Sequence, residues 1–378
     1  MWLYIFWGIM EKIFLYKPYI TDKEKKYVNE ALDTGWISSR GKFVKEFEEK
    51  FAEKLNRKHA LTTSSGTTAL HLSLETLKLE KGTAVICPTL TFVASANAIR
   101  YAGLIPIFID CQKTYVSEYD DFKKGFEIAE RNSLKVSAIM PVNLYGVQTD
   151  VEKLKSFNVP IVEDCAESFG STLNDKISGS CYSDVSCFSF FGNKIITTGE
   201  GGMIVTDDDA LYNRMLMLRS IGQKPNSPQR YLHIDVGYNY RLTNIACAIG
   251  LGQLENFDWV LSQKIKLGAY YRELLDNSLF APEPANFVGN NWMVTIMVKN
   301  NTIREGLMLY LDANGIETRP AFLPIHSMIH LGKSYRANNM SNSENVSACG
   351  INLPSYPELT KEEIASVCKH INDYLDNY

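Results

Sequence analysis

Short apolar runs alternate with helical segments over about 150 residues, and this alternation limits the possible folds more than any other feature of the chain. The runs that predict strands are, in chain order, residues 60–62, 84–87, 105–109, 137–141, 160–163, 185–190 and 203–206. Helical patterns such as 67–77 and 94–101 fall between several of them. Because the runs lack polar alternation, we expect strands covered on both faces, as in a largely parallel sheet. The sequence therefore predicts a layered α/β domain.

A change of pattern near Leu242 predicts a second domain. From Thr243 to about Leu275 the apolar spacing is helical, and a loop rich in proline and then shorter elements follow. A chain of 378 residues is long enough for one large domain and a smaller one. We expect a large domain at residues 10–250 and a small α+β domain at 251–378, with the boundary inside the long helix.

The first nine residues are mostly apolar and need a separate interpretation. They are too short to span a bilayer, and no small-residue cleavage site follows them. We expect residues 1–9 to be an N-terminal extension, and an interfacial membrane anchor is the alternative.

Charge and cysteine usage exclude several classes of protein. The chain has 39 Lys and Arg against 43 Asp and Glu, a net charge of -4, so no basic excess points to nucleic acid. None of its eight cysteines forms a C-x-x-C pair, which favours free thiols over disulfides or a zinc site. We therefore expect a cytoplasmic protein without a metal, a nucleic-acid partner or a membrane partner.

The segment 62–69, with the sequence Thr-Thr-Ser-Ser-Gly-Thr-Thr-Ala, leads from a predicted strand into a predicted helix. Small residues there leave backbone N–H groups free at the positive end of the helix, which is a general way to bind a phosphate. Gly66 and Thr67 are the candidate donors. An ordinary capped helix is the alternative interpretation.

Asp164 follows a predicted buried strand, at the carboxyl end where α/β folds place their ligands. A buried carboxylate needs a partner, and a protonated heterocyclic nitrogen would be suitable. A carboxylate that caps a helix is the equally plausible alternative.

Lys194 ends an aromatic strand, in Phe-Phe-Gly-Asn-Lys, and enters a glycine-rich turn at 199–202. Apolar surroundings lower the pKa of a lysine and make its amine nucleophilic, as Schiff-base chemistry requires. Taken alone, Lys194 is better explained as a surface lysine whose amine reaches solvent.

Together, a phosphate site, a carboxylate at a strand end and a lysine in a glycine-rich turn are the parts needed to hold pyridoxal phosphate. The chain also resembles the sugar-nucleotide aminotransferases of the DegT/DnrJ/EryC1/StrS family from about Met10 onward. The segments that carry the resemblance are residues 35–39, 64–67, 163–164, 190–194, 198–202 and 237–241. The resemblance implies fold type I of the pyridoxal-phosphate-dependent transferases, as in aspartate aminotransferase, with a mostly parallel mixed sheet.

The resemblance also implies roles for individual residues. Lys194 would bind the cofactor aldehyde and carry the proton, and Asp164 would pair with the pyridine nitrogen. The other residues implied to bind the cofactor are Gly66, Thr67, Phe92, Glu167, Ser189 and Asn239. Phe92 would stack on the ring, and Asn239 would reach the phosphate from a neighbouring subunit. The active sites would therefore be shared in a homodimer.

Four further residues are expected on the substrate side. Arg319 and His326 lie in the predicted small domain, in the region that relatives use against the sugar nucleotide. Trp36 would close over the site, with simple packing as the alternative. Asn143 stands where many relatives have His, and its amide can hydrogen-bond a sugar or cofactor oxygen but cannot titrate near neutrality.

The implied reaction moves an amino group from glutamate, through pyridoxamine phosphate, to a nucleotide-linked keto sugar. The segment 231–244 most resembles the branch that aminates C4 of 4-keto-6-deoxy sugars to form perosamine, with viosamine-forming enzymes as the alternative. A sugar dehydratase on the same scaffold would carry His in place of Lys194. A non-catalytic binding protein is the remaining alternative.

Overall fold

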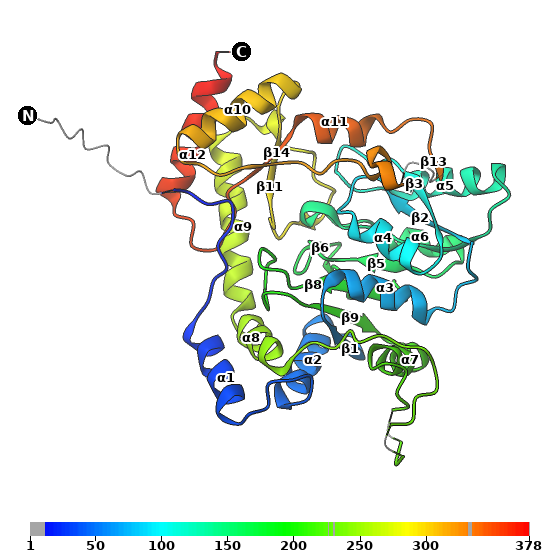
Figure 1. The fold of residues 1–378 in the computed structure, drawn as a ribbon. Helices are drawn as coiled ribbons and strands as arrows, with labels where there is room; N and C mark the ends of the chain where they lie inside the picture. Colours follow the sequence, from blue (N-terminus) through cyan, green and yellow to red (C-terminus); the bar gives the residue numbers. More distant parts are fainter. Residues whose placement is uncertain (1–11, 226, 230, 332–334, 378) are drawn as a thin grey trace, which may run out of the picture.

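The computed structural model describes residues 12–377 except 226, 230 and 332–334, so the predicted extension at residues 1–9 lies outside the described residues. A mixed eight-stranded sheet lies at the centre (Figure 1). Its strands, in spatial order, are β1 (His59–Thr63), β9 (Gly202–Thr206), β8 (Val185–Ser189), β5 (Val162–Asp164), β4 (Val136–Ile139), β2 (Ala84–Pro88), β3 (Ile105–Ile109) and β13 (Tyr335–Arg336). Two parallel bridges, Ile139 to Ile161 and Val142 to Asp164, join its two halves.

The sheet is parallel except for β9, which is antiparallel to both β1 and β8. All seven predicted strands are present, with ends within two residues of those expected. Every residue of β2, β5 and β9 is buried, as expected for strands covered on both faces. The predicted α/β fold is therefore confirmed, and the carboxyl ends of β1, β2, β5 and β8 meet at one edge of the sheet.

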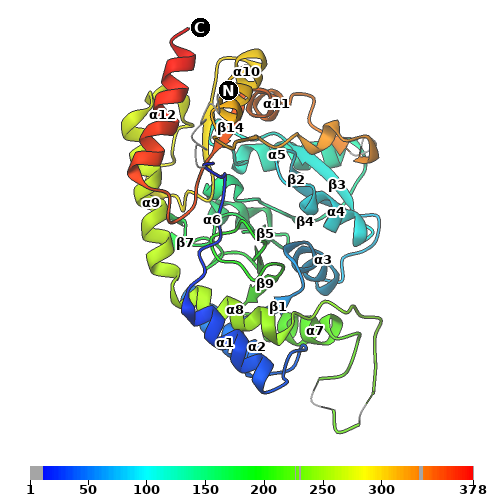
Figure 2. The same cartoon turned by 60° about the vertical axis from the view of Figure 1, so that its left-hand side comes forward.

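Helices cover both faces of this sheet because each presents one apolar stripe to it. The helices that pack around the sheet are α3 (Gly66–Thr76), α4 (Ala94–Tyr101), α5 (Tyr119–Arg131), α6 (Val151–Leu154) and α7 (Asp209–Arg219). Helices α1 (Asp22–Asp33), α2 (Lys42–Leu55) and α8 (Asn244–Glu255) pack together beyond β1 (Figure 2). In α2, Phe43, Phe47 and Phe51 are buried on one face, in the same core cluster as Phe188 and Phe190.

The single long helix predicted from Thr243 to about Leu275 is wrong. The structure has α8 and a second helix, α9 (Phe257–Leu274), separated by Asn256, whose φ and ψ are -102° and 1°. The Asn256 amide donates hydrogen bonds to the Gly252 carbonyl and to Thr21 Oγ1, both at 3.1 Å. An asparagine that bonds to nearby groups competes with the regular helix, and here it also fixes the junction to the start of α1.

A smaller antiparallel sheet forms the C-terminal part, as the predicted small α+β domain requires. It consists of β11 (Val294–Met297), β14 (Gly350–Leu353) and β12 (Arg319–Pro320). Helices α9, α10 (Asn301–Ala313) and α12 (Lys361–Leu375) share one apolar core with it. Figure 2 shows α9 running from α8 to the side of α12.

The two parts also exchange segments, which the sequence does not reveal. Strand β13 and the helix α11 (Ser341–Cys349) belong to the C-terminal third of the chain, yet β13 pairs with β3 of the large sheet. Conversely, Ile13 near the N-terminus pairs with Ile316 and packs in the C-terminal core. A boundary at residue 250 stays a prediction.

Three short strands form a further small sheet: β10 (Phe287–Val288), β6 (Thr172–Leu173) and β7 (Lys176–Ile177).

All eight cysteines are free, and all except Cys181 are buried. Among the described residues, no helix combines the length and apolarity needed to cross a bilayer.

Candidate active site

The predicted site residues meet at the edge of the sheet where the parallel strands end. Asp164 is the last residue of β5, Ser189 is the last residue of β8, and β1 leads through Ser64 and Ser65 into α3. Lys194 follows β8 by five residues. One small cavity is lined by Glu167, Ser189 and Lys194 together, which lie apart in the sequence.

The start of α3 is built to receive an anion. Ser65 and Thr68 form a capping box: the N–H of Ser65 donates to Thr68 Oγ1 at 3.0 Å, and the N–H of Thr68 donates to Ser65 Oγ at 3.2 Å. In the described part of the chain, the N–H groups of Gly66 and Thr67 donate to no acceptor, as helix geometry predicts. A Cβ at Gly66 would lie 2.9 Å from the Cβ of Ser189, so the glycine lets the Ser189 hydroxyl approach this end. The two N–H groups and this hydroxyl fit a phosphate.

Asp164 is a buried carboxylate without a cation at ion-pair distance among the described residues. Its two oxygens accept hydrogen bonds from Ser95 Oγ at 2.8 Å and from the Ala166 N–H at 3.1 Å. Burial raises the pKa of Asp164, and these hydrogen bonds and the charge of Lys194 partly offset that effect. A protonated pyridine nitrogen would supply the missing positive partner.

The amine of Lys194 lies in a largely buried setting. Its Nζ is 3.4 Å from Glu167 Oε1 and 3.8 Å from the centre of the Trp292 ring. Burial lowers the pKa of Lys194, and the charges of Glu167 and Asp164 oppose that effect. Glu167 itself has its pKa raised by burial, while Lys194 and the N–H of Tyr145 pull it down. A lysine in this setting is a suitable nucleophile for a carbonyl group.

Phe92 lies in the turn that leads from β2 to α4. Its ring is 56% exposed although Leu90 and Thr91 beside it are buried, and its centroid is 5.9 Å from that of Phe322. An aromatic ring presented to the site in this way can stack on a planar ligand. Together with the free N–H groups of α3, the unpaired Asp164 and the buried Lys194, it forms a set of residues that fits pyridoxal phosphate.

The structure corrects the prediction that Asn143 binds the substrate. Its side chain is fully buried, and its amide donates to Glu163 Oε1 and Ser178 Oγ, both at 2.8 Å. Its Oδ1 accepts the N–H of Thr149 at 2.9 Å. Glu163 is a buried carboxylate that needs such donors, so the amide supports the residue beside Asp164 and has no surface left for a sugar.

The other three predicted substrate residues do not line the small cavity that contains Lys194. Trp36 is 57% exposed, and Arg319 is exposed and paired with Glu317 at 2.6 Å. The ring of His326 is mostly buried, with Nδ1 2.8 Å from Thr89 Oγ1 and Nε2 3.3 Å from a carboxylate oxygen of Glu344. A direct contact between His326 and a sugar would first break one of these contacts.

Asn239 is exposed, and its Oδ1 accepts a hydrogen bond from Arg241 at 2.6 Å. The carbonyl of the next residue, Tyr240, accepts the N–H of Ser64 at 2.8 Å. The segment around Asn239 therefore lies beside the entrance to α3, whose free N–H groups fit a phosphate.

Two residues that hold the site were missed by the sequence analysis. Ser95 donates to Asp164, and Trp292 lies over the Lys194 amine. Ser95 lies 69 positions from Asp164, and Trp292 lies 98 positions from Lys194, so no local pattern joins them. The one local signal for Ser95 is that it lies three residues after Phe92, so that both side chains can face the same side where α4 begins.

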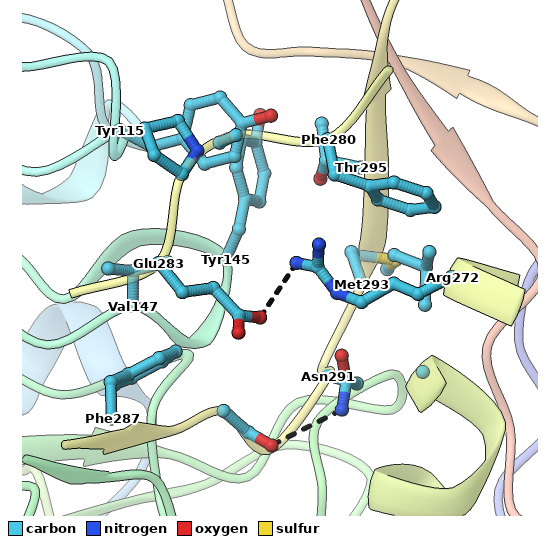
Figure 3. A pocket seen from close by; sticks show the side chains of 15 residues that line it. Tyr115, Tyr145, Val147, Arg272, Phe280, Glu283, Phe287, Asn291, Met293 and Thr295 are labelled. Atoms are coloured by element: carbon cyan, nitrogen blue, oxygen red, sulfur yellow. Dashed lines mark hydrogen bonds and ion pairs between the residues drawn. The ribbon is translucent and has the colours of Figure 1, made fainter. Parts of the chain in front are cut away.

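A separate cavity lies between Tyr145, α9 and β11, and no predicted site residue lines it (Figure 3). Inside it the Arg272 guanidinium points at the Glu283 carboxylate, with an N to O distance of 2.7 Å. Because its charged groups satisfy each other, this cavity does not compete with the Lys194 cluster as a reaction site.

Comparison with known proteins agrees with this geometry. The sequence profile of the DegT/DnrJ/EryC1/StrS aminotransferase family matches residues 18–372. The GDP-perosamine synthase of Escherichia coli O157:H7 is 43% identical over 374 residues, covering 97% of this chain and 100% of the relative. The GDP-perosamine synthase of Vibrio cholerae is 38% identical over 375 residues, covering 96% of this chain and 99% of the relative.

Solved structures support the fold. The Helicobacter pylori aminotransferase PseC, involved in the biosynthesis of pseudoaminic acid, matches with a TM-score of 0.87 at 24% identity, covering 97% of this chain and 100% of that one. The predicted fold type I is confirmed by such neighbours. The chain therefore belongs to the DegT/DnrJ/EryC1/StrS aminotransferase family and is a pyridoxal-phosphate-dependent aminotransferase.

Proposed function

We propose that the protein transfers the amino group of glutamate to C4 of a GDP-linked 4-keto-6-deoxy sugar and so forms a GDP-perosamine. The observation that carries the proposal is 43% identity to a GDP-perosamine synthase over almost the whole of both chains. The predicted catalytic lysine, Lys194, stands inside the cluster of site residues rather than at the surface.

Pyridoxal phosphate, when bound, would supply an electron-accepting ring and a carbonyl carbon outside the ring that takes up the amino group. Lys194 would hold this group through its carbonyl carbon, and the free Lys194 amine would take up and return the proton of the substrate carbon. Asp164 would keep the ring nitrogen protonated, because the charge of this buried carboxylate is otherwise unpaired among the described residues. Glu167 holds the released Lys194 amine close to the site.

We propose that Arg319 and Trp36, which lie on different elements, each contact the sugar nucleotide. Arg319 is exposed and has further N–H donors beyond those that face Glu317, so it can bind a diphosphate in a bidentate way. Trp36 offers an exposed ring for stacking. His326 would act indirectly, by fixing Thr89 at the end of β2.

A substrate screen tests the proposal. The purified holoenzyme is given glutamate and a 4-keto-6-deoxy sugar linked to GDP, UDP or dTDP, and the product is identified by its mass. We expect the amino sugar from the GDP substrate at a rate at least about tenfold above the others, equivalent to about 1.4 kcal/mol in transition-state binding. A clear preference for UDP or dTDP would favour the viosamine-type alternative instead.

An absorbance spectrum and an analysis of the products separate the two other classes of function. A chain that binds its cofactor through Lys194 should absorb violet light and so appear yellow, and this band should shift when glutamate is added. A binding protein would show no glutamate-dependent change. A dehydratase would release ammonia and no stable amino sugar.

We also propose that the enzyme is a cytoplasmic homodimer with shared sites. Eight free thiols suit a reducing compartment. Exposed apolar side chains gather on the segment that precedes Asn239, namely Ile221, Tyr231, Ile234 and Val236. Such a surface suits burial against a second copy, and an isologous dimer would place Asn239 of each chain near the partner's phosphate site.

Mixing two inactive variants tests this arrangement. In a heterodimer of Lys194→Ala and Asn239→Ala chains, one site carries both lesions and the other is intact. If subunits exchange at random, we expect about half of the dimers to be mixed, each with one normal site, so activity returns to about one quarter of the wild-type value. The measurement is turnover before and after subunit exchange. Each variant exchanged with itself is the control, and no recovery on mixing would place Asn239 and Lys194 in the same chain's site.

A further inference from the structure

The segment Asn290–Trp292 is held on two sides by buried hydrogen bonds. On the large-sheet side, the Asn290 amide donates to the carbonyls of Glu167 and Phe169 at 3.0 and 3.1 Å, and its Oδ1 accepts the N–H of Trp292 at 2.9 Å. The segment is thereby tied directly to the backbone of Glu167, the residue that faces the Lys194 amine.

On the other side, a buried lysine of α9 holds the same segment. Lys264 is almost fully buried, and its Nζ donates to the Trp292 carbonyl at 3.1 Å, the Ser355 carbonyl at 2.6 Å and Ser355 Oγ at 2.5 Å. The Ser355 hydroxyl uses its own hydrogen on the Asn291 carbonyl at 2.8 Å, so it must accept from Lys264. Three acceptors around one amine favour its ammonium form, which has three N–H donors, over the neutral form, which has two.

This arrangement is costly, because Lys264 forms no ion pair with a carboxylate among the described residues. Burial lowers the pKa of Lys264 far below its ordinary value. A methionine or leucine would fill the same space without that cost. The buried charge therefore calls for an explanation other than stability, and its contacts all lead to the segment that carries Trp292.

Trp292 connects this anchor to the amine of Lys194. Its indole N–H donates to the Asn193 carbonyl at 2.7 Å, beside Lys194 in the chain, and the Lys194 amine lies 3.8 Å from the centre of its ring. The Tyr16 hydroxyl donates to the Lys194 carbonyl at 2.5 Å and so holds the backbone of the same residue. An amine at this distance from a tryptophan ring and away from solvent is in the range of a strong cation–π interaction.

We propose that Trp292 is a positioning residue for Lys194, that its ring stabilises the ammonium form of the lysine amine once the free amine has taken up a proton, and that Lys264 fixes the ring in place. The proposal rests on the proposed function, because only a lysine that is released during each cycle needs such a resting position. The ring would keep the released amine next to the site and, once the amine has taken up the proton of the substrate carbon, would hold the ammonium there until the proton is delivered.

The test uses the cofactor-free protein and changes the charge distribution of the Trp292 ring while keeping its size. Tryptophan is replaced throughout by fluorotryptophans with increasing numbers of fluorine atoms, which weaken the negative face of the ring without changing its shape. The pH dependence of trace acetylation at Lys194, read by mass spectrometry of its peptide, then gives the proton affinity of that amine. The charges of Glu167 and Asp164, which act on Lys194, are unchanged throughout the series.

We expect the proton affinity of Lys194 to fall stepwise with each fluorine, by about tenfold over the series. In Trp292→Phe the other tryptophans are still fluorinated, so this variant should show no dependence on fluorine content. A flat series in the wild-type protein overturns the proposal. The proposal is also overturned if the proton affinity of Lys194 falls with fluorine content as steeply in Trp292→Phe as in the wild-type protein, since another tryptophan would then be responsible. This dependence of proton affinity on fluorine content is the slope of the series.

Lys264 is tested in the same series with a matched control on the same helix. Lys264→Met should flatten the slope at least about twofold, because the Trp292 carbonyl loses its donor and the ring is less well fixed. Lys266→Met changes an exposed lysine two residues away and should leave the slope unaltered. An unchanged slope in Lys264→Met would remove Lys264 from the proposal.

Failure of this inference and failure of the proposed function give different results. The labelling series reports on the contact between Lys194 and Trp292 without cofactor or substrate. A flat series together with normal amino sugar formation would leave the proposed function intact. A normal series in a protein that forms no amino sugar would leave the contact intact and overturn the proposed function.

Discussion

Lys194→Ala should reduce turnover with glutamate and a sugar nucleotide by at least about 10⁴-fold, since one residue supplies both the covalent attachment and the proton transfer. The amine is the only lysine group in the cluster around Glu167 and Ser189 within the described residues. Steady-state rates and single-turnover absorbance changes with glutamate measure the loss. Cofactor binding should remain detectable by equilibrium dialysis, because the start of α3, Ser189 and Asp164 are untouched.

Chemical rescue provides the control for Lys194→Ala. A small amine such as methylamine fits the space left by the side chain and can carry the proton, so it should restore part of the glutamate half-reaction in proportion to its concentration. The same amine should have no effect on the wild-type enzyme. A variant that transaminates at a near-normal rate without added amine would show that Lys194 is not the catalytic residue.

Asp164→Asn should slow the half-reaction with glutamate by about 10²- to 10³-fold, the usual cost of one well-placed electrostatic contact in an active site. The amide keeps the shape of the carboxylate but cannot hold the ring nitrogen in its protonated form. The fold should be unharmed, because burial already disfavours the charge of Asp164, as its raised pKa indicates. We therefore expect an equal or higher melting temperature for the cofactor-free variant.

Ser95→Ala should slow the same half-reaction less than Asp164→Asn does. It removes one hydrogen bond from the carboxylate and leaves the charge, so the half-reaction should slow by about tenfold or less. Single-turnover rates with glutamate should decrease from the wild-type protein to Ser95→Ala and then to Asp164→Asn. If Asp164→Asn reacts with glutamate at the wild-type rate and instead lowers the melting temperature, Asp164 only caps the local backbone through Ala166.

Much of the site could be predicted because its residues lie in local patterns. Gly66 and Thr67 begin a helix after a strand, Asp164 ends a strand, and Lys194 enters a glycine-rich turn; each pattern is visible within a few residues. The order of strands and helices then brings these segments to one edge, because parallel strands end on the same side of a sheet.

The residues that hold the site could not be found in this way. Ser95, Trp292 and Lys264 act through contacts with residues far away in the chain, and local sequence patterns do not predict such contacts. The predicted substrate role of Asn143 failed for the same reason: a short polar motif does not show whether its amide faces a ligand or a buried carboxylate.

The sequence alone determined the α/β layers, the parallel strands and the segments that we propose bind the cofactor, because strand burial and helix starts depend on neighbours along the chain. Only the tertiary structure decided where α8 ends and how β13 joins the large sheet. It also decided which side chains enclose the Lys194 amine. Those features depend on hydrogen bonds and ring contacts between distant segments, whose energies are set by burial and distance in the folded chain.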